Sequence, residues 1–158
     1  MTPRDSSNHL YIGIDVGGTS ITTGVVDSSG RARSRVNQPT EAARGWQAGL
    51  ETIIDLVGQA VAEAETSLEE IAAVGVATPG TMDIPAGRLL DPPNLPGWQD
   101  MPIRDLVGER LKRPTVLQND ANAAAYGEYW AGAGRKAYSL VFWTMGTGIG
   151  CGIIIGDT

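Results

Sequence analysis

Residues 10–27, LYIGIDVGGTSITTGVVD, decide the fold: two β-rich runs flank a turn at Gly17-Gly18. A weaker polar run over residues 32–38 follows a second turn. Strands joined by such short connections must pair antiparallel, because parallel neighbours need a long crossover. The stretch therefore predicts a three-stranded antiparallel meander at the start of a sheet.

The remainder of the chain alternates helices and strands. Apolar residues recur at spacings of three and four over residues 44–65, which indicates an amphipathic helix. We expect the other elements to be a strand at 71–77, a helix at 102–112, a strand at 114–117, a helix at 121–130 and strands at 138–145 and 151–155, with 85–97 irregular or at a sheet edge. The order β-β-β-α-β-α-β-α-β-β predicts an α/β fold with a mixed sheet flanked by helices.

Composition narrows the function classes. The 158 residues are 42% hydrophobic, enough for one domain with a real core. A net charge of −6 argues against a nucleic-acid surface, and one cysteine and one histidine argue against disulfides and a metal cage. Because the apolar runs are only strand-length and none forms a signal sequence, we expect a cytoplasmic protein.

The first candidate site is Asp15 with the turn Gly17, Gly18 and Thr19, at the end of the first strand. Glycine lets backbone N–H groups approach phosphate oxygens, and Thr19 adds a hydroxyl donor. An acid at a strand end can orient Mg²⁺ through its waters. Alone, this turn would be better interpreted as an ordinary hairpin turn.

A second glycine-rich turn, Gly146-Thr147-Gly148-Ile149-Gly150, joins the last two strands. A two-residue turn would close that hairpin with less glycine. Two such turns in one chain favour a paired phosphate clamp over two unrelated hairpins, although neither has the Walker pattern.

The third candidate is Asn119-Asp120, where a strand meets a helix. Both residue types cap helices, so capping is expected for one of them. Capping is compatible with catalysis, because phosphoryl transfer needs its nucleophile positioned more than deprotonated early.

Two rigid loops contain the remaining candidates, Gly80 in Thr78-Pro79-Gly80 and Asn94 in the stretch NLPGW. The amide of Asn94 offers both donors and acceptors, which suits vicinal sugar hydroxyls. The alternative is a surface turn in which Trp98 packs on the core.

Taken in order, five segments resemble the ROK family of repressors and sugar kinases: IGIDVGGTSITTGVVD, VGVATPGTMD, NLPGW, LQNDANAAAYGE and TMGTGIGCGIII. The likeness runs from about Leu10 to the end of the chain. It implies an actin/hexokinase-like, ribonuclease H-like fold and phosphorylation of a hexose such as glucose by ATP with Mg²⁺. It further implies Asp120 as general base; Gly80, Asn94, Asn119 and Asp120 in the sugar site; Asp15 assisting Mg²⁺; and Gly17, Gly18, Thr19, Gly146, Thr147 and Gly148 on the ATP phosphates.

The resemblance also implies parts that this chain does not contain. ROK kinases continue with a Glu/His sugar segment, an adenine-binding region, a final helix and a structural zinc cluster, so zinc is expected only in that missing half. We therefore expect residues 1–9 to be disordered, 10–118 to form the first lobe, and 119–158 to begin the second. We also expect the chain alone to be inactive and to self-associate through its last two strands, and the family to form homo-oligomers.

Three other functions stay open. A ROK repressor needs a helix-turn-helix before the first strand, and only nine polar residues precede it here. A non-kinase actin-like ATPase is less compatible with the Asn94 loop and the Asn119-Asp120 pair. A binding-only fragment that holds sugar weakly is the third.

Overall fold

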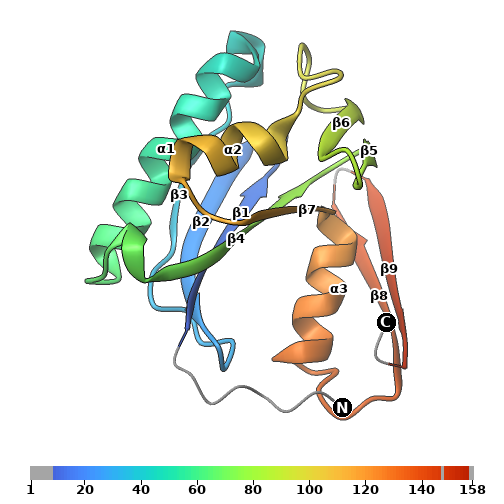
Figure 1. Cartoon of the computed structure of the whole chain (residues 1–158). Coiled ribbons are helices and arrows are strands. Elements are labelled where there is room, and N and C mark those ends of the chain that lie inside the picture. Colours follow the sequence, from blue (N-terminus) through green and yellow to red (C-terminus); the bar gives the residue numbers. More distant parts are fainter. Residues whose placement is uncertain (1–8, 147, 157–158) are drawn as a thin grey trace.

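The computed structural model describes residues 9–146 and 148–156. A five-stranded mixed sheet with the order β3-β2-β1-β4-β7 forms its centre (Figure 1). The sheet strands are β1 (Leu10–Val16), β2 (Ser20–Asp27), β3 (Val36–Pro39), β4 (Ile71–Thr78) and β7 (Thr115–Asn119). The helices are α1 (Gly45–Glu63), α2 (Ile103–Leu111) and α3 (Asp120–Trp130), with 3₁₀ turns η1 (Ala42–Arg44) and η2 (Leu68–Glu70). Two small hairpins, β5 (Thr81–Asp83) with β6 (Arg88–Asp91) and β8 (Ser139–Met145) with β9 (Ile149–Ile155), complete the described chain.

The predicted meander is confirmed. β1 pairs antiparallel with β2, and β2 pairs antiparallel with β3. β4 and β7 then add in parallel, each after a helix, so that β1 lies in the middle of a mixed sheet. The carboxyl ends of the three parallel strands therefore meet at one edge of the sheet.

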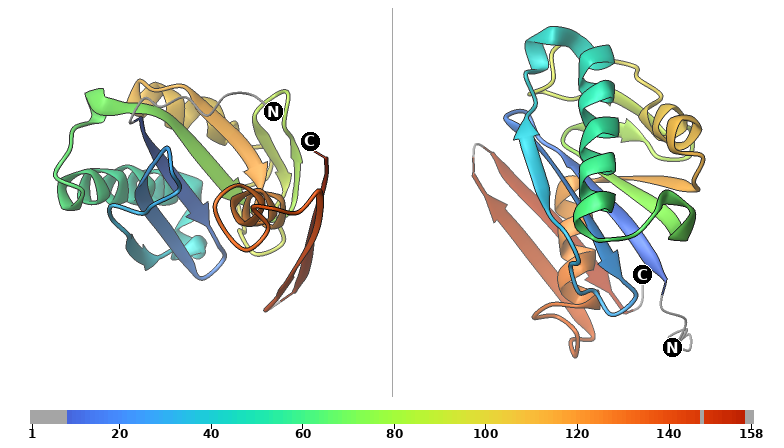
Figure 2. Two further views of the ribbon diagram at one scale, coloured as in Figure 1. Left: turned by 90° about the horizontal axis from the view of Figure 1, so that it is seen from below. Right: turned by 90° about the vertical axis from the view of Figure 1, so that its left-hand side faces the viewer.

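One face of the sheet forms the core. Ile12, Ile14 and Val16 alternate along β1 toward this face and are at most 2% exposed. Buried Ile53 and Val57 of α1 belong to the same core cluster. Helices α1 and α2 cover this face, whereas α3 and the β8–β9 hairpin lie on the opposite side (Figure 2). In the described part of the chain, no helix is both long enough and apolar enough to cross a membrane.

The expected strand at 32–38 is partly wrong, because regular pairing begins only at Val36. The hydroxyl of Ser34 accepts a hydrogen bond from Val25 N–H at 3.1 Å, in place of a backbone carbonyl. The carboxylate of Asp27 meanwhile accepts from the N–H groups of Ser29 and Arg31, which bends the chain into a turn. The N–H groups of Arg33 and Ser34 both donate to Val25 O, so the backbone pairing in this segment is irregular and is supplemented by side chains.

The expected element order also lacked the β5–β6 hairpin, which lies partly within the segment taken as irregular or edge structure. Its strands are only three and four residues long, too short for a periodic pattern to show. The strand pairing of the last hairpin extends further than expected, since β9 begins at Ile149 and Ile149 is in register with Met145.

Candidate active site

The turn from β1 to β2 is built around glycine at position 18. A Cβ atom there would lie 2.6 Å from Asn94 Cβ and 2.9 Å from Asn94 O, so only glycine fits. Within the turn, Gly17 N–H donates to Ser20 O at 2.9 Å. The N–H groups of Gly18 and Thr19 donate to no acceptor among the described residues, so they remain available to a ligand. The close approach of Gly18 to Asn94 also places the Asn94 loop against the first glycine turn.

Asp15 lies two residues before this turn, on the sheet face opposite the core. Its backbone is in register with Thr22 of β2 and Ala77 of β4. The side chain is exposed, yet it lies inside a concave cleft, where burial by surrounding protein atoms raises its pKa. The negative charge of Asp120 raises that pKa further, and the positive charge of Arg35 opposes it. The charge of a carboxylate from a distant part of the chain thus acts on Asp15.

Asn119 and Asp120 lie where β7 passes directly into α3. Asn119 Oδ1 accepts from the N–H groups of Ala121 at 3.0 Å and Asn122 at 3.3 Å, which confirms it as the helix N-cap. Asp120 is the first residue of the helix, and one of its oxygens accepts from Ala121 N–H at 2.7 Å. The Asp120 side chain is otherwise exposed, at the end of the sheet where the parallel strands terminate.

The Gly80 loop and the Asn94 loop lie side by side. Gly80 adopts φ 89°, and a Cβ atom there would lie 2.6 Å from Pro92 Cα. Asn94 is exposed, and its amide makes no hydrogen bond within the described chain. The loop is anchored by Leu95 and Trp98, both fully buried, so Trp98 packs on the core as the alternative interpretation of this loop predicted. Anchoring of this kind leaves the Asn94 amide free while its backbone is held.

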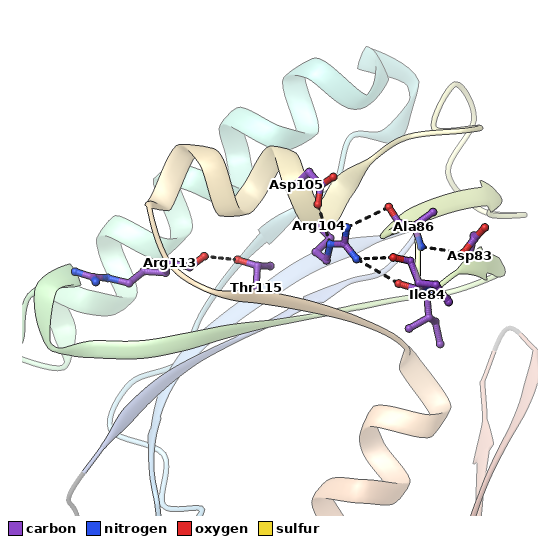
Figure 3. Close-up of polar contacts among 8 residues, drawn as sticks. Asp83, Ile84, Ala86, Arg104, Asp105, Arg113 and Thr115 are labelled. Atoms are coloured by element: carbon purple, nitrogen blue, oxygen red, sulfur yellow. Dashed lines mark hydrogen bonds and ion pairs between the residues drawn. The ribbon is translucent and has the colours of Figure 1, made fainter.

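Arg104 at the start of α2 braces the β5–β6 hairpin that leads to this loop (Figure 3). Its guanidinium donates to the carbonyl oxygens of Pro85 at 2.9 Å, Ala86 at 3.3 Å and Ile84 at 3.4 Å. Asp105 accepts from Arg104 Nε at 2.8 Å and orients the group. The sequence contained no sign of this brace, because the partners are backbone carbonyls about twenty residues away.

The second glycine turn is held near Asp120 through the contact of the last hairpin with α3. A Cβ atom on Gly150 would lie 3.0 Å from Ala121 Cβ, and one on Gly152 would lie 2.6 Å from Ala121 O. The turn itself is closed by a hydrogen bond from Gly146 N–H to Gly148 O at 3.0 Å. Thr147, the third candidate of this turn, lies outside the described residues.

A cleft of about 770 Å³ separates the open face of the sheet from α3 and β9. Asp15 lines it, together with polar side chains that sequence reasoning did not single out: Thr22, Ser34, Arg35, Gln118 and Asn122. Gln118 Oε1 accepts from Asn119 N–H at 2.8 Å, so it also supports the helix cap. Alternation along β7, which places Val116 and Gln118 on one face, is the only signal that could have suggested Gln118.

The candidate residues therefore gather at one end of the sheet. Strand β1 ends with Asp15 and Val16 and leads into the first glycine turn. Gly80 follows β4, Asn119 is the last residue of β7, and Asp120 comes directly after it. Ligands of open α/β sheets commonly bind at the carboxyl ends of strands. The described chain holds no cluster of three or more His, Cys, Asp or Glu side chains suited to a metal ion. A cation here would need phosphate oxygens and waters as its further ligands.

Comparison with known proteins identifies the family. The profile of the ROK family matches residues 11–158. This chain belongs to the ROK family. Among its ROK relatives, glucokinase from Streptomyces coelicolor is 39% identical over 148 residues, which are 94% of this chain and 44% of that enzyme. The chain thus spans about half the length of the curated relatives it matches.

Solved ROK structures give the same fold. The ROK hexokinase of Thermus thermophilus superposes with a TM-score of 0.82 at 39% identity, covering 93% of this chain and 47% of that one. A ROK family glucokinase from Streptomyces griseus, solved in complex with glucose and AMPPNP, gives 0.79 at 39% identity, covering 94% and 45%. The fold of this ROK chain is therefore actin/hexokinase-like, as the sequence predicted.

Relatives within the ROK family divide into kinases and repressors. The xylose repressor of Caldicellulosiruptor bescii is 36% identical over 106 residues, 67% of this chain and 26% of that protein. At the level of the family, the glucokinase relatives support a sugar kinase.

Proposed function

We propose that the protein to which this chain belongs phosphorylates a hexose with ATP, as a glucokinase-like enzyme. The observation that carries the proposal is the exposed carboxylate of Asp120, which begins α3 at the end of β7 and is close enough to Asp15 for their charges to interact. A base, phosphate-binding N–H groups and a hydroxyl-binding amide are the parts that sugar phosphorylation requires.

In this mechanism Asp120 accepts a hydrogen bond from the attacking sugar hydroxyl and takes its proton as the phosphoryl group transfers. Asn119 contributes its side chain on the sugar side while its Oδ1 caps α3, so the base and a sugar contact share one rigid junction. Asn94 would bind further hydroxyls, and Gly80 would line the pocket where no side chain fits. Glucose is the default acceptor, because curated relatives of the chain are glucokinases.

The two glycine turns would bind the phosphates of ATP. The unpaired N–H groups of Gly18 and Thr19 would donate to phosphate oxygens, with Gly17 giving the turn its freedom. The second turn, Gly146-Thr147-Gly148, would approach from the hairpin on α3. Together they would hold the ATP phosphates in line with the hydroxyl held by Asp120.

The residues present fit a magnesium ion. Asp15 has an exposed carboxylate without a hydrogen-bond partner in the described chain, and the negative charge of Asp120 helps to raise its pKa. A divalent cation would relieve the repulsion between these acids, and ATP would supply the other oxygen ligands. Bound there, Mg²⁺ would neutralise charge on the transferring phosphate. Asp15 would hold the ion through its waters.

We propose that residues 10–118 form one lobe of this enzyme and 119–158 begin a second. Since the relatives are about twice as long, we expect the 158-residue chain alone not to turn over sugar. Any structural zinc is expected outside this chain. We also expect a cytoplasmic homo-oligomer that does not bind a membrane. Because the net charge is −6, we expect no nucleic-acid binding.

A repressor is the second candidate, favoured by the identity to a xylose repressor. Such a protein would bind sugar and respond to it without consuming ATP. Turnover therefore separates the two candidates.

The test is ADP release with Mg-ATP against a panel of hexoses, comparing this chain with the longest protein that its gene encodes. General-base catalysis contributes about 10²- to 10⁴-fold, so we expect Asp120→Asn to lower kcat of the active form by that factor. Asp55→Asn, an exposed acid on α1, is the matched control and should leave kcat unchanged.

Each other result has a definite meaning. Unchanged kcat in Asp120→Asn would remove the base assignment. Sugar binding without ADP release would favour the repressor or a binding-only protein, and ADP release that no sugar stimulates would favour a different ATPase. Turnover by the 158-residue chain would show that it needs no further half.

A further inference from the structure

Thr40 lies directly behind the first glycine turn and holds it from two sides. It follows the last residue of β3 and is only 3% exposed. Its hydroxyl donates to Gly17 O at 2.6 Å, and its backbone N–H donates to Thr19 O at 3.0 Å. One residue thus binds the carbonyl groups on both sides of Gly18.

These bonds determine how the peptide between Gly17 and Gly18 is oriented. In a trans peptide the C=O and the next N–H point in opposite directions. Because Gly17 O is drawn toward Thr40, the N–H of Gly18 points away from Thr40, and that N–H has no acceptor in the described chain. Glycine on both sides would otherwise let this peptide rotate with little steric hindrance.

We propose that Thr40 is a positioning residue for nucleotide binding, which fixes the Gly17–Gly18 peptide with its N–H directed at the ATP phosphates. The proposal rests on the proposed function, because it assigns the phosphates to this turn. Thr40 itself is too deeply buried to touch ATP or sugar, so it acts only through the turn.

The side-chain hydroxyl is the group under test. Thr40→Val keeps the shape of the side chain but leaves Gly17 O without its donor, whereas Thr40→Ser restores a hydroxyl. Thr52→Val is the matched control: Thr52 on α1 also donates to a backbone carbonyl, Ala48 O at 3.1 Å, away from the candidate site. The melting temperature of each variant shows that it folds.

The kinetic experiment uses whichever protein releases ADP in the hexose test, this chain or the longest protein that its gene encodes. Since one hydrogen bond contributes about a factor of ten in an equilibrium constant, we expect Thr40→Val to raise KM for ATP about tenfold. KM for the sugar should stay within about twofold of the wild type, and Thr40→Ser and Thr52→Val should resemble the wild type throughout. This division between the two KM values would not follow from a general loss of stability.

The proposal is overturned if Thr40→Val leaves KM for ATP unchanged, if Thr40→Ser is as weak as Thr40→Val, or if Thr52→Val causes the same rise. Calorimetric titration with ATP in the absence of sugar gives a readout that does not need turnover. If the wild type binds ATP but phosphorylates no hexose, the proposed function fails, while weaker ATP binding by Thr40→Val still supports the role of Thr40. If the wild type binds no ATP, the Thr40 proposal fails as well.

Discussion

At the scale of single residues, Asp15 lies in a setting that is unfavourable for its negative charge. Burial in the cleft and the nearby charge of Asp120 both raise its pKa above the ordinary value of 3.8, and Arg35 only partly compensates. The folded protein therefore binds a proton on Asp15 more readily than the unfolded chain does. Function at this position is expected to come at the expense of stability.

We expect Asp15→Asn to stabilise the fold at neutral pH when Mg²⁺ is absent. Because the folded pKa is the higher one, the Asp15 contribution is most favourable below about pH 4 and is lost as pH rises through the folded pKa. The variant should therefore melt at a higher temperature than the wild type at pH 7, and the difference should disappear below about pH 4. The measurement is thermal unfolding across this pH range.

Asp55→Asn on the outer face of α1 serves as its control and should show no such pH-dependent gain. An Asp15→Asn protein that melts lower than the wild type at pH 7 would mean that its carboxylate makes a net stabilising contact instead.

The candidate residues themselves could be predicted from the sequence, but their contacts could not. Glycine turns, an Asn-Asp junction and an acid at a strand end are local patterns, and the structure brings most of them to one end of the sheet. The contact of Gly18 with Asn94 joins residues far apart in the sequence, and no local pattern encodes it. The same holds for Thr40 and Arg104, whose partners are mainly backbone carbonyls.

At the scale of elements, small residues let the β8–β9 hairpin lie close to α3. A Cβ atom on Gly152 would be 2.5 Å from Ala125 Cβ and 2.6 Å from Ala121 O. Real Cβ atoms are not found this close to other atoms, so the hairpin would have to move away from the helix. The position of the second glycine turn relative to Asp120 depends on this contact.

We expect Gly152→Ala to weaken the attachment of the hairpin, because the added methyl group meets backbone and has no room. Gly127→Ala is the matched control, since no atom lies within 4 Å of a Cβ atom there and Gly127 is within α3. That control should stabilise the protein by about 0.5–1 kcal/mol through helix propensity. Thermal unfolding and amide hydrogen exchange in β8 and β9 check both results. Equal exchange in Gly152→Ala and wild type would contradict the close contact.

Element prediction succeeded where patterns were long and failed where strands were short. The first two strands, α1, α2 and α3 were predicted to within about two residues, because apolar periodicity and turn residues agree there. The β5–β6 hairpin was missed, and the strand at 32–38 was placed too early. In both cases side chain to backbone bonds, such as those of Arg104 and Ser34, determine the conformation.

At the scale of the whole molecule, the outer face of the β8–β9 hairpin is apolar and uncovered. Its inner face packs on α3, but large side chains of the outer face are more than half exposed. They are Val141, Trp143, Met145, Ile149, Ile153 and Ile155. Contiguous exposed apolar side chains of this kind promote association.

We expect the 158-residue chain to self-associate through this outer face. Trp143→Lys, which places a charge at its centre, should shift the chain toward monomer, as measured by light scattering over a concentration series. Leu90→Lys is the control, because Leu90 is also an exposed apolar strand residue but lies on β6. A wild-type chain that stays monomeric at high concentration would contradict this expectation.

The contact between Gly18 and Asn94 has a consequence for how the two substrates communicate. Under the proposed function, the first glycine turn binds nucleotide and the Asn94 loop binds sugar. Atoms of the two loops lie in contact, so ordering one loop would restrict the other. Such coupling is reciprocal: if sugar tightens ATP binding by some factor, ATP must tighten sugar binding by the same factor. The dissociation constant of each ligand, measured with and without the other ligand, would give two independent values of that factor. A factor of one would mean that the two loops respond independently.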